Sequence, residues 1–107
     1  MALGDAEIAF VTDLFAELGP ISTRKMFGGL GIYLDGEIFA LMRSEGTLLL
    51  KGANDMAQIL TDAGWTHWTY TRKSGAHAAM PYWEMPAELL DNADDACDWA
   101  RRAISHL

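Results

Sequence analysis

Residues 24–33 read Arg24-Lys25-Met26-Phe27-Gly28-Gly29-Leu30-Gly31-Ile32-Tyr33, and the rest of the chain is organised around them. Two cations and two bulky apolar residues lead into three glycines and an apolar strand. Glycine at this density lets the backbone bend or approach another group closely. The adjacent cations could hold an anion, but a kink where one strand feeds the next is the more frequent meaning of such glycines. The stretch therefore predicts a strand junction whose cations are open candidates for contact.

The chain has 107 residues, 50% of them hydrophobic, which suits one domain that buries roughly two-thirds of its unfolded surface. We expect this single domain to cover residues 1–107. Cys97 is the one cysteine and the N-terminus lacks a signal-peptide pattern, so we expect a reduced, cytoplasmic protein. No apolar run approaches the roughly 20 residues that cross a bilayer, so no membrane span is expected.

The net charge of −7 bears on partners. A protein that binds duplex DNA by itself gains most of its affinity from cations that replace counterions on phosphates. Here the eight cations are scattered, and adjacent pairs occur only at Arg24-Lys25, Arg72-Lys73 and Arg101-Arg102. The composition therefore disfavours direct DNA binding, unless the three pairs meet on one face.

Apolar periodicity divides the chain into helices and strands. It predicts an amphipathic helix at residues 5–18, a second helix after Gly52 that stops at Gly64, a helical turn from Pro86 to Leu90, and a last helix from residue 93. Residues 21–27 look extended, and strands are expected at residues 30–34, 37–43, 47–51, 65–72 and 76–83. The result is a three-stranded meander, a helix and a second hairpin.

Several local features follow from residue types. Asp35-Gly36 suits a type I′ hairpin turn. Asp5 and Asn54 are expected as helix N-caps. Pro81 is expected at a sheet edge or near a strand end, because it cannot donate to a ladder. Asp98 and Arg102 have the spacing of an i, i+4 ion pair.

The element order predicts an α+β fold of two layers with a single antiparallel sheet, in the order α-β-β-β-α-β-β-α. Helices on one side leave the other face of such a sheet uncovered. The apolar residues Tyr33, Phe39 and Leu41 and the aromatics of the second hairpin cannot all point the same way. We therefore expect an apolar sheet face that self-associates or docks another protein.

The sequence shows only weak patterns for metal binding, catalysis or nucleotide binding. The three histidines lie on different elements, although His67 and His77 could face each other across the second hairpin. Cys97 lies among alanines, as an inert buried thiol does. The glycines match neither a phosphate loop nor a dinucleotide fingerprint, because they lead into a strand. We expect no catalytic residue, no metal and no cofactor.

Several blocks together carry a family resemblance. Besides residues 24–33 they are residues 35–41, residues 48–51, Met80-Pro81-Tyr82-Trp83-Glu84-Met85-Pro86 and Trp99-Ala100-Arg101-Arg102-Ala103. In order and spacing they resemble the N-terminal domain of the TfoX/Sxy competence regulators, over nearly the whole chain. The resemblance implies a two-layer fold similar to secretion chaperones and YjbR-like proteins. It also implies a link to the activation of DNA-uptake genes, where family regulators act with the cyclic-AMP receptor protein. Full-length members have a second, helical C-terminal domain that this sequence does not include.

These observations favour a non-enzymatic interaction domain, a homodimer linked to transcriptional regulation through protein contacts, with a partner in the transcription machinery. The predicted contact residues are Arg24, Lys25, Met26, Phe27 and Tyr33, with Tyr82 and Trp83 from the second hairpin. The bulky residues among them are equally compatible with a place in the core, and the cations with solvent. The alternative is a small-ligand or anion-binding module that uses residues 24–31.

Overall fold

The computed structural model describes residues 4–26, 28–71, 73–75 and 77–107. Phe27, one of the predicted contact residues, lies outside the described residues. The elements, in which η marks a 3-10 helix, are α1 (Asp5–Leu14), η1 (Ala16–Leu18), β1 (Ile21–Met26), β2 (Gly29–Leu34), β3 (Glu37–Met42), β4 (Leu48–Lys51), α2 (Met56–Asp62), β5 (Thr66–Thr71), β6 (His77–Glu84), η2 (Ala87–Asp91) and α3 (Ala93–Ser105).

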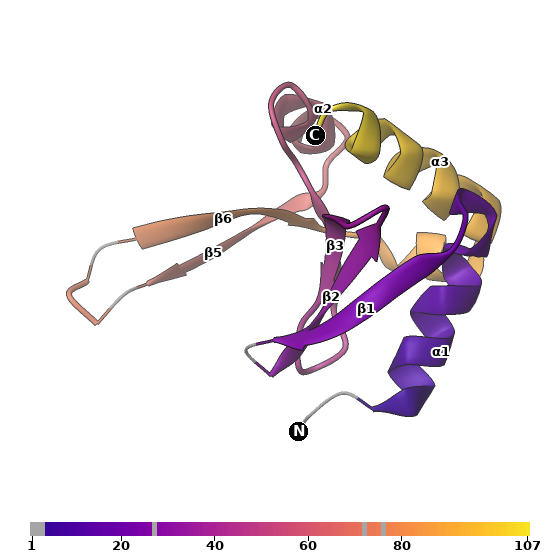
Figure 1. Ribbon diagram of the computed structural model, residues 1–107. Coiled ribbons are helices and arrows are strands. Elements are labelled where there is room, and N and C mark those ends of the chain that lie inside the picture. Colours follow the sequence, from indigo (N-terminus) through magenta and orange to yellow (C-terminus); the bar gives the residue numbers. More distant parts are fainter. Residues whose placement is uncertain (1–3, 27, 72, 76) are drawn as a thin grey trace.

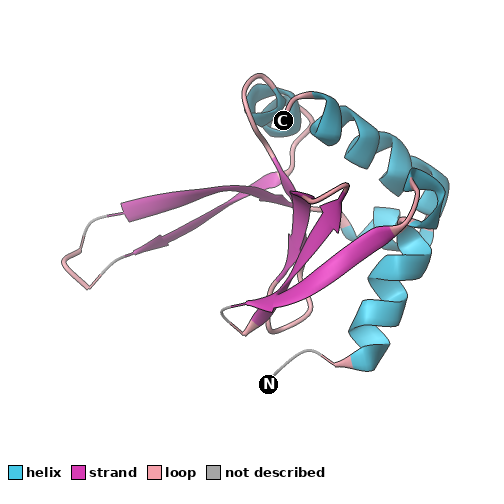
Figure 2. Ribbon diagram, in the orientation of Figure 1, coloured by secondary structure: helices cyan, strands magenta, loops and turns pink. Residues whose placement is uncertain are grey.

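In the described part of the chain, the strands form one six-stranded sheet in the order β1-β2-β3-β4-β6-β5, with every neighbouring pair antiparallel. The predicted α+β class with a single antiparallel sheet is confirmed. The meander before α2 has four strands, because the extended residues after Pro20 form the separate edge strand β1. The helices gather on one side of the sheet, and the β5–β6 hairpin projects away from the body (Figures 1 and 2).

The helix side of the sheet holds the main core. Its largest fully buried side chains include Phe15 from η1's N-terminal end, Phe39 from β3 and Met56 from α2. The rings of Phe15 and Phe39 meet edge to face with centroids 5.2 Å apart, an arrangement that aromatic pairs prefer. The small residues Ala96, Ala100 and Ala103 let α3 lie close to the sheet. This core covers one face of the sheet, and among the described residues no helix lies on the other face.

Turn and cap chemistry explains the element boundaries, with two corrections. Asp35 and Gly36 both have positive φ angles, 53° and 83°, as predicted for the β2–β3 turn. The N-cap of α1 is Gly4 and not Asp5, because the Glu7 carboxylate accepts the Gly4 backbone N–H at 2.7 Å. The N-cap of α2 is Asp55 and not Asn54, whose φ of 52° leaves its side chain free to donate to the His106 carbonyl.

Three further predictions need correction. Asp98 pairs with Arg101 at 3.0 Å, one residue earlier than predicted, while Arg102 lies over the Trp99 ring. Pro81 lies inside β6, where the β5 pairing is irregular and a missing N–H breaks no regular ladder. His67 stands opposite Trp83, so it does not face His77.

Candidate functional site: the helix-free face of the sheet

The helix-free side of the sheet has an apolar cluster of its own, formed because alternate residues of each strand point away from the main core. Leu41, Leu49 and Tyr82 are its buried centre, with exposed fractions of 9%, 0% and 7%. The half-buried side chains that pack on this centre are Met26, Trp68 and Met80. We call these six residues the open-face cluster. They come from β1, β3, β4, β5 and β6, so the cluster exists only when the sheet is complete.

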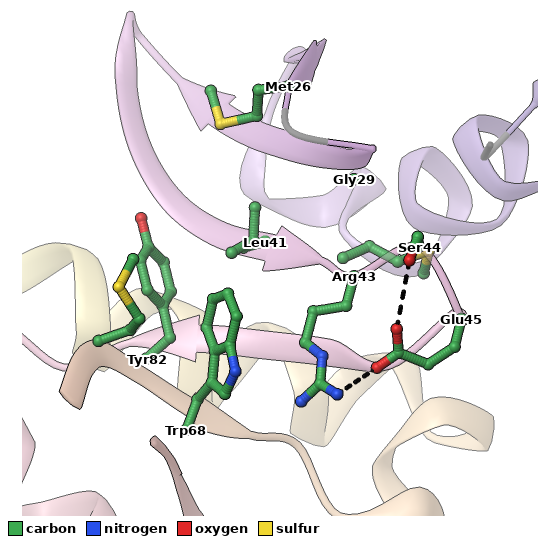
Figure 3. A pocket seen from close by; sticks show the side chains of 10 residues that line it. Met26, Gly29, Leu41, Arg43, Ser44, Glu45, Trp68 and Tyr82 are labelled. Carbon is green, nitrogen blue, oxygen red and sulfur yellow. Dashed lines mark hydrogen bonds and ion pairs between the residues drawn. The ribbon is translucent and has the colours of Figure 1, made fainter. Parts of the chain in front are cut away.

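A pocket of about 340 Å³ opens in this cluster, between the ends of the β1–β2 hairpin and the strands β5 and β6 (Figure 3). Its apolar wall comes from the open-face cluster, except Leu49, together with Met42 and Gly29. Arg43, Ser44 and Glu45 supply the polar rim. The volume lies at the lower end of the range of ligand pockets, and the lining matches the mostly apolar walls of such sites.

The polar rim is held by its own contacts. The Arg43 guanidinium forms an ion pair with the Glu45 carboxylate at 2.5 Å, and the Ser44 hydroxyl donates to the same carboxylate at 3.5 Å (Figure 3). The Arg43 Cζ lies 5.3 Å from the centre of the Trp68 ring, within the range of a cation–π contact. Arg43 therefore fixes the Trp68 indole at the pocket wall.

The Tyr82 side chain is buried at the centre of the open-face cluster. Burial raises the pKa of Tyr82, and the nearby Tyr33 phenol raises it further. The phenol therefore stays neutral at physiological pH and can both donate and accept a hydrogen bond.

The structure brings together only some of the predicted contact residues. Met26 and Tyr82 line the pocket. Arg24 shares their face, since its Cζ lies 5.6 Å from the Tyr33 ring centre and it stands opposite Gly31 in the register. Lys25 is exposed but lies one position from both Arg24 and Met26, so it points to the other side of β1.

Trp83 does not belong to this surface, and its predicted role as a contact residue is corrected. It is 5% exposed and lies in the main core, in parallel stacking with His67 at a centroid distance of 4.0 Å. The His67 Nε2 lies 2.7 Å from the Met80 carbonyl, next to the irregular part of the β5–β6 pairing. The Trp83 Nε1 is buried without a hydrogen-bond partner among the described residues. Trp83 therefore anchors the projecting hairpin to the core.

The expectation of a large exposed apolar face is only partly met. Among the described residues the exposed large hydrophobic side chains are Phe10 on α1 and the C-terminal Leu107, at 39% and 37%, and neither joins the open-face cluster. Trp68 and Tyr33 are half-buried. The face presents a pocket with a half-buried rim in place of a flat aromatic patch.

Gly29 and Gly31 shape the sheet, because protein atoms lie close to both of them. A Cβ added to Gly29 would stand 2.5 Å from the Met42 carbonyl oxygen. One added to Gly31 would meet the side chains of Tyr33, Met26 and Ile38 at 3.0–3.3 Å. The backbone at Gly29 and Gly31 is thus already covered by protein, and Gly29 lines the pocket.

Among the residues that the structure describes, little supports a metal site or a reactive cysteine. No group of three or more His, Cys, Asp and Glu side chains there could hold a metal ion. The Cys97 Sγ is buried and donates to the Leu14 carbonyl at 3.2 Å. Burial raises the pKa of the Cys97 thiol, and the nearby Arg101 only partly offsets this effect. Within the same ranges, no helix has the length and apolar character that would carry it across a bilayer.

The fold and face define a class: a small α+β domain whose single antiparallel sheet is covered by helices on one side only. The TfoX N-terminal domain family model matches residues 13–107, which span α3, the whole sheet and part of α1. The chain belongs to this family. Comparison with curated proteins gives no match.

Proposed function

We propose that this TfoX N-terminal-like chain is a non-enzymatic interaction domain that contributes to the regulation of DNA-uptake genes through protein contacts made by the open-face cluster. The observation that carries the proposal is the pocket, because an apolar concavity on a helix-free sheet face suits the insertion of a partner's side chain. The methionines and the aromatic rings of its wall are residue types that adapt to a protein partner.

Self-association belongs to the same proposal. The strand β1 forms one edge of the sheet, so its outer backbone groups are available to a strand from a second copy. Sedimentation velocity over a range of concentrations tests this part separately, and a monomer at every concentration would remove it.

The test of the main proposal is affinity co-purification from the native cell with quantitative mass spectrometry. The double variant Trp68→Ala plus Met80→Ala opens the pocket wall without touching the main core. The matched control is Phe10→Ala, which removes an exposed ring from α1. We expect one or more partners from the transcription machinery to be retained by the wild type and by the control and lost with the double variant. Transcripts of DNA-uptake genes should change in the same way; unchanged partners in all three samples contradict the proposal.

A second candidate is the binding of a small apolar ligand, favoured by the pocket volume of about 340 Å³. The probe is 1-anilinonaphthalene-8-sulfonate, whose fluorescence rises in apolar sites. Saturable binding at one site that is abolished by Trp68→Ala would favour this candidate, provided that the co-purified partners do not depend on the same residue.

A further inference from the structure

Charge is divided unequally between the two layers of the fold. Eleven of the fifteen carboxylates lie on the helices or at their N-caps, and of the seven cations that the structure describes, two, Arg101 and Arg102, lie there. The strands and their turns carry the other four carboxylates and, among the described residues, five cations. An acidic partner is therefore repelled by the helix layer and can approach closely only on the sheet side.

Three described cations of the sheet layer lie on the open face: Arg43 lines the pocket, and Arg24 and Lys51 lie near it. Arg24 lies two positions before the pocket residue Met26, and Lys51 stands opposite the pocket residue Tyr82 in the register of β4 and β6. In the described part of the chain, neither Arg24 nor Lys51 has a carboxylate within ion-pair distance. Arg43 is neutralised by Glu45, and Glu84 is the one carboxylate that the strands place on this face. Two cations without a carboxylate partner among the described residues, Arg24 on β1 and Lys51 on β4, thus lie on the face that holds the apolar pocket.

A second copy of the chain is a poor occupant for this face. Its own open face carries Arg24 and Lys51 and, among the strand carboxylates, Glu84, so that both faces have an excess of positive charge and repel each other. Its helix layer is acidic but presents one isolated large exposed ring among the described residues, that of Phe10. A partner with carboxylates next to a protruding apolar side chain fits better, because the carboxylates can pair with the cations while the apolar side chain fills the pocket.

We propose that the open face binds an acidic segment of a partner protein, whose large apolar side chain enters the pocket while neighbouring carboxylates lie near Arg24 and Lys51. This inference rests on the proposed function and adds the chemistry of the partner. The flexible side chains of Met26 and Met80 at the rim adapt to the shape of the inserted group.

The experiment selects binders from a random library of short peptides displayed on phage, with the full chain immobilised. We expect enriched peptides to carry a Leu, Met, Phe or Trp flanked by Asp and Glu. The most enriched peptide is then synthesised with a fluorescent label, and its affinity is measured by fluorescence polarisation.

Two double charge reversals of equal size distinguish a contact of the peptide with Arg24 and Lys51 from a general effect of the net charge. Arg24→Glu plus Lys51→Glu should weaken binding of that peptide by about tenfold or more, because two attractive pairs become repulsive. Arg101→Glu plus Arg102→Glu makes the same change in net charge on α3 and should leave binding within about twofold. Trp68→Ala should also weaken binding, and circular dichroism verifies the fold of every variant.

Several results overturn the inference: no enriched peptide, enrichment of basic or uncharged peptides, or equal effects of the two charge reversals. Each of them leaves the proposed function standing if cellular partners are still lost with Trp68→Ala plus Met80→Ala. If those partners are retained by that variant, the proposed function fails whatever the peptides show.

Discussion

Gly29 packs its Cα against the Met42 carbonyl so closely that a methyl group in place of its hydrogen would stand 2.5 Å from the oxygen. The two residues belong to the neighbouring strands β2 and β3, at the end of the sheet where the pocket opens. Since the oxygen is backbone, it cannot turn aside as a side chain would. The glycine run that distinguishes this sequence is therefore required by a close approach within the sheet.

Replacement of two glycines in this run should have different effects. Gly29→Ala forces two strand backbones apart and should lower the free energy of unfolding by about 3 kcal/mol. Gly31→Ala meets only the ends of the side chains of Tyr33, Met26 and Ile38, so the loss should be about 1 kcal/mol. Urea titration followed by circular dichroism measures both values. An equal loss for the two variants would contradict the assignment of the clash to the Met42 carbonyl.

The element order was predictable from the sequence because local rules determine it. The alternation of Leu30, Ile32 and Leu34 in β2, the Asp35-Gly36 turn and the periodicity of α3 each depend on a few neighbouring residues. The edge strand β1 was harder to predict as a separate strand. Its burial alternates only weakly, and its pairing with β2 cannot be inferred from its own residues alone.

The candidate site could be predicted only in part. Met26 and Tyr82 were predicted as contact residues, whereas Trp68, Met80 and Leu41 were missed, although Met80 and Leu41 also lie in the blocks that carry the family resemblance. The face to which a strand residue points depends on register, and the β5–β6 register shifts between His67 and Thr69. The adjacent residues Tyr82 and Trp83 differ in role because successive strand residues point to opposite faces, which places Tyr82 at the pocket and Trp83 in the core.

Gly52→Ala should disturb the base of the projecting hairpin. A Cβ at residue 52 would lie 2.5 Å from Cζ3 and 2.7 Å from Cε3 of Trp83, and 3.2 Å from the Ala57 Cα. The indole ring must therefore move from its stack with His67. We expect a change in near-ultraviolet circular dichroism and a loss of about 2 kcal/mol of stability. Gly46→Ala is the control for the steric clash, since nothing lies within 4 Å of its added methyl group, although its φ of 95° adds strain. A near-ultraviolet spectrum unchanged by Gly52→Ala would contradict the contact.

Duplex DNA should not bind to this chain alone. The described cations of the sheet layer are dispersed, with Lys25 on the opposite side of β1 from Arg24, and the helix layer is strongly acidic. Non-specific DNA affinity comes from several cations that contact phosphates together. We therefore expect no electrophoretic mobility shift with micromolar protein, even at low salt of about 50 mM. A shift that disappears steeply as salt is added would show that the scattered cations do cooperate, and Arg24→Ala plus Lys25→Ala would then locate the contact.

Cys97 should make stability fall at alkaline pH. Its buried thiol has a pKa above the ordinary value of 9.0, so above that pH the unfolded chain loses a proton that the folded chain retains. The unfolded state then binds fewer protons, and the free energy of unfolding falls by up to about 1.4 kcal/mol per pH unit until the folded thiol also ionises. Urea titrations between pH 8 and pH 10 should show this slope in the wild type and a flatter one in Cys97→Ala.

Burial also raises the pKa of Tyr82 above its ordinary value of 10.0, so this residue adds its own loss of stability at higher pH in both proteins. Identical slopes below pH 10 would mean that the thiol is hydrated, and the hydrogen bond from Sγ to the Leu14 carbonyl would then not persist in solution.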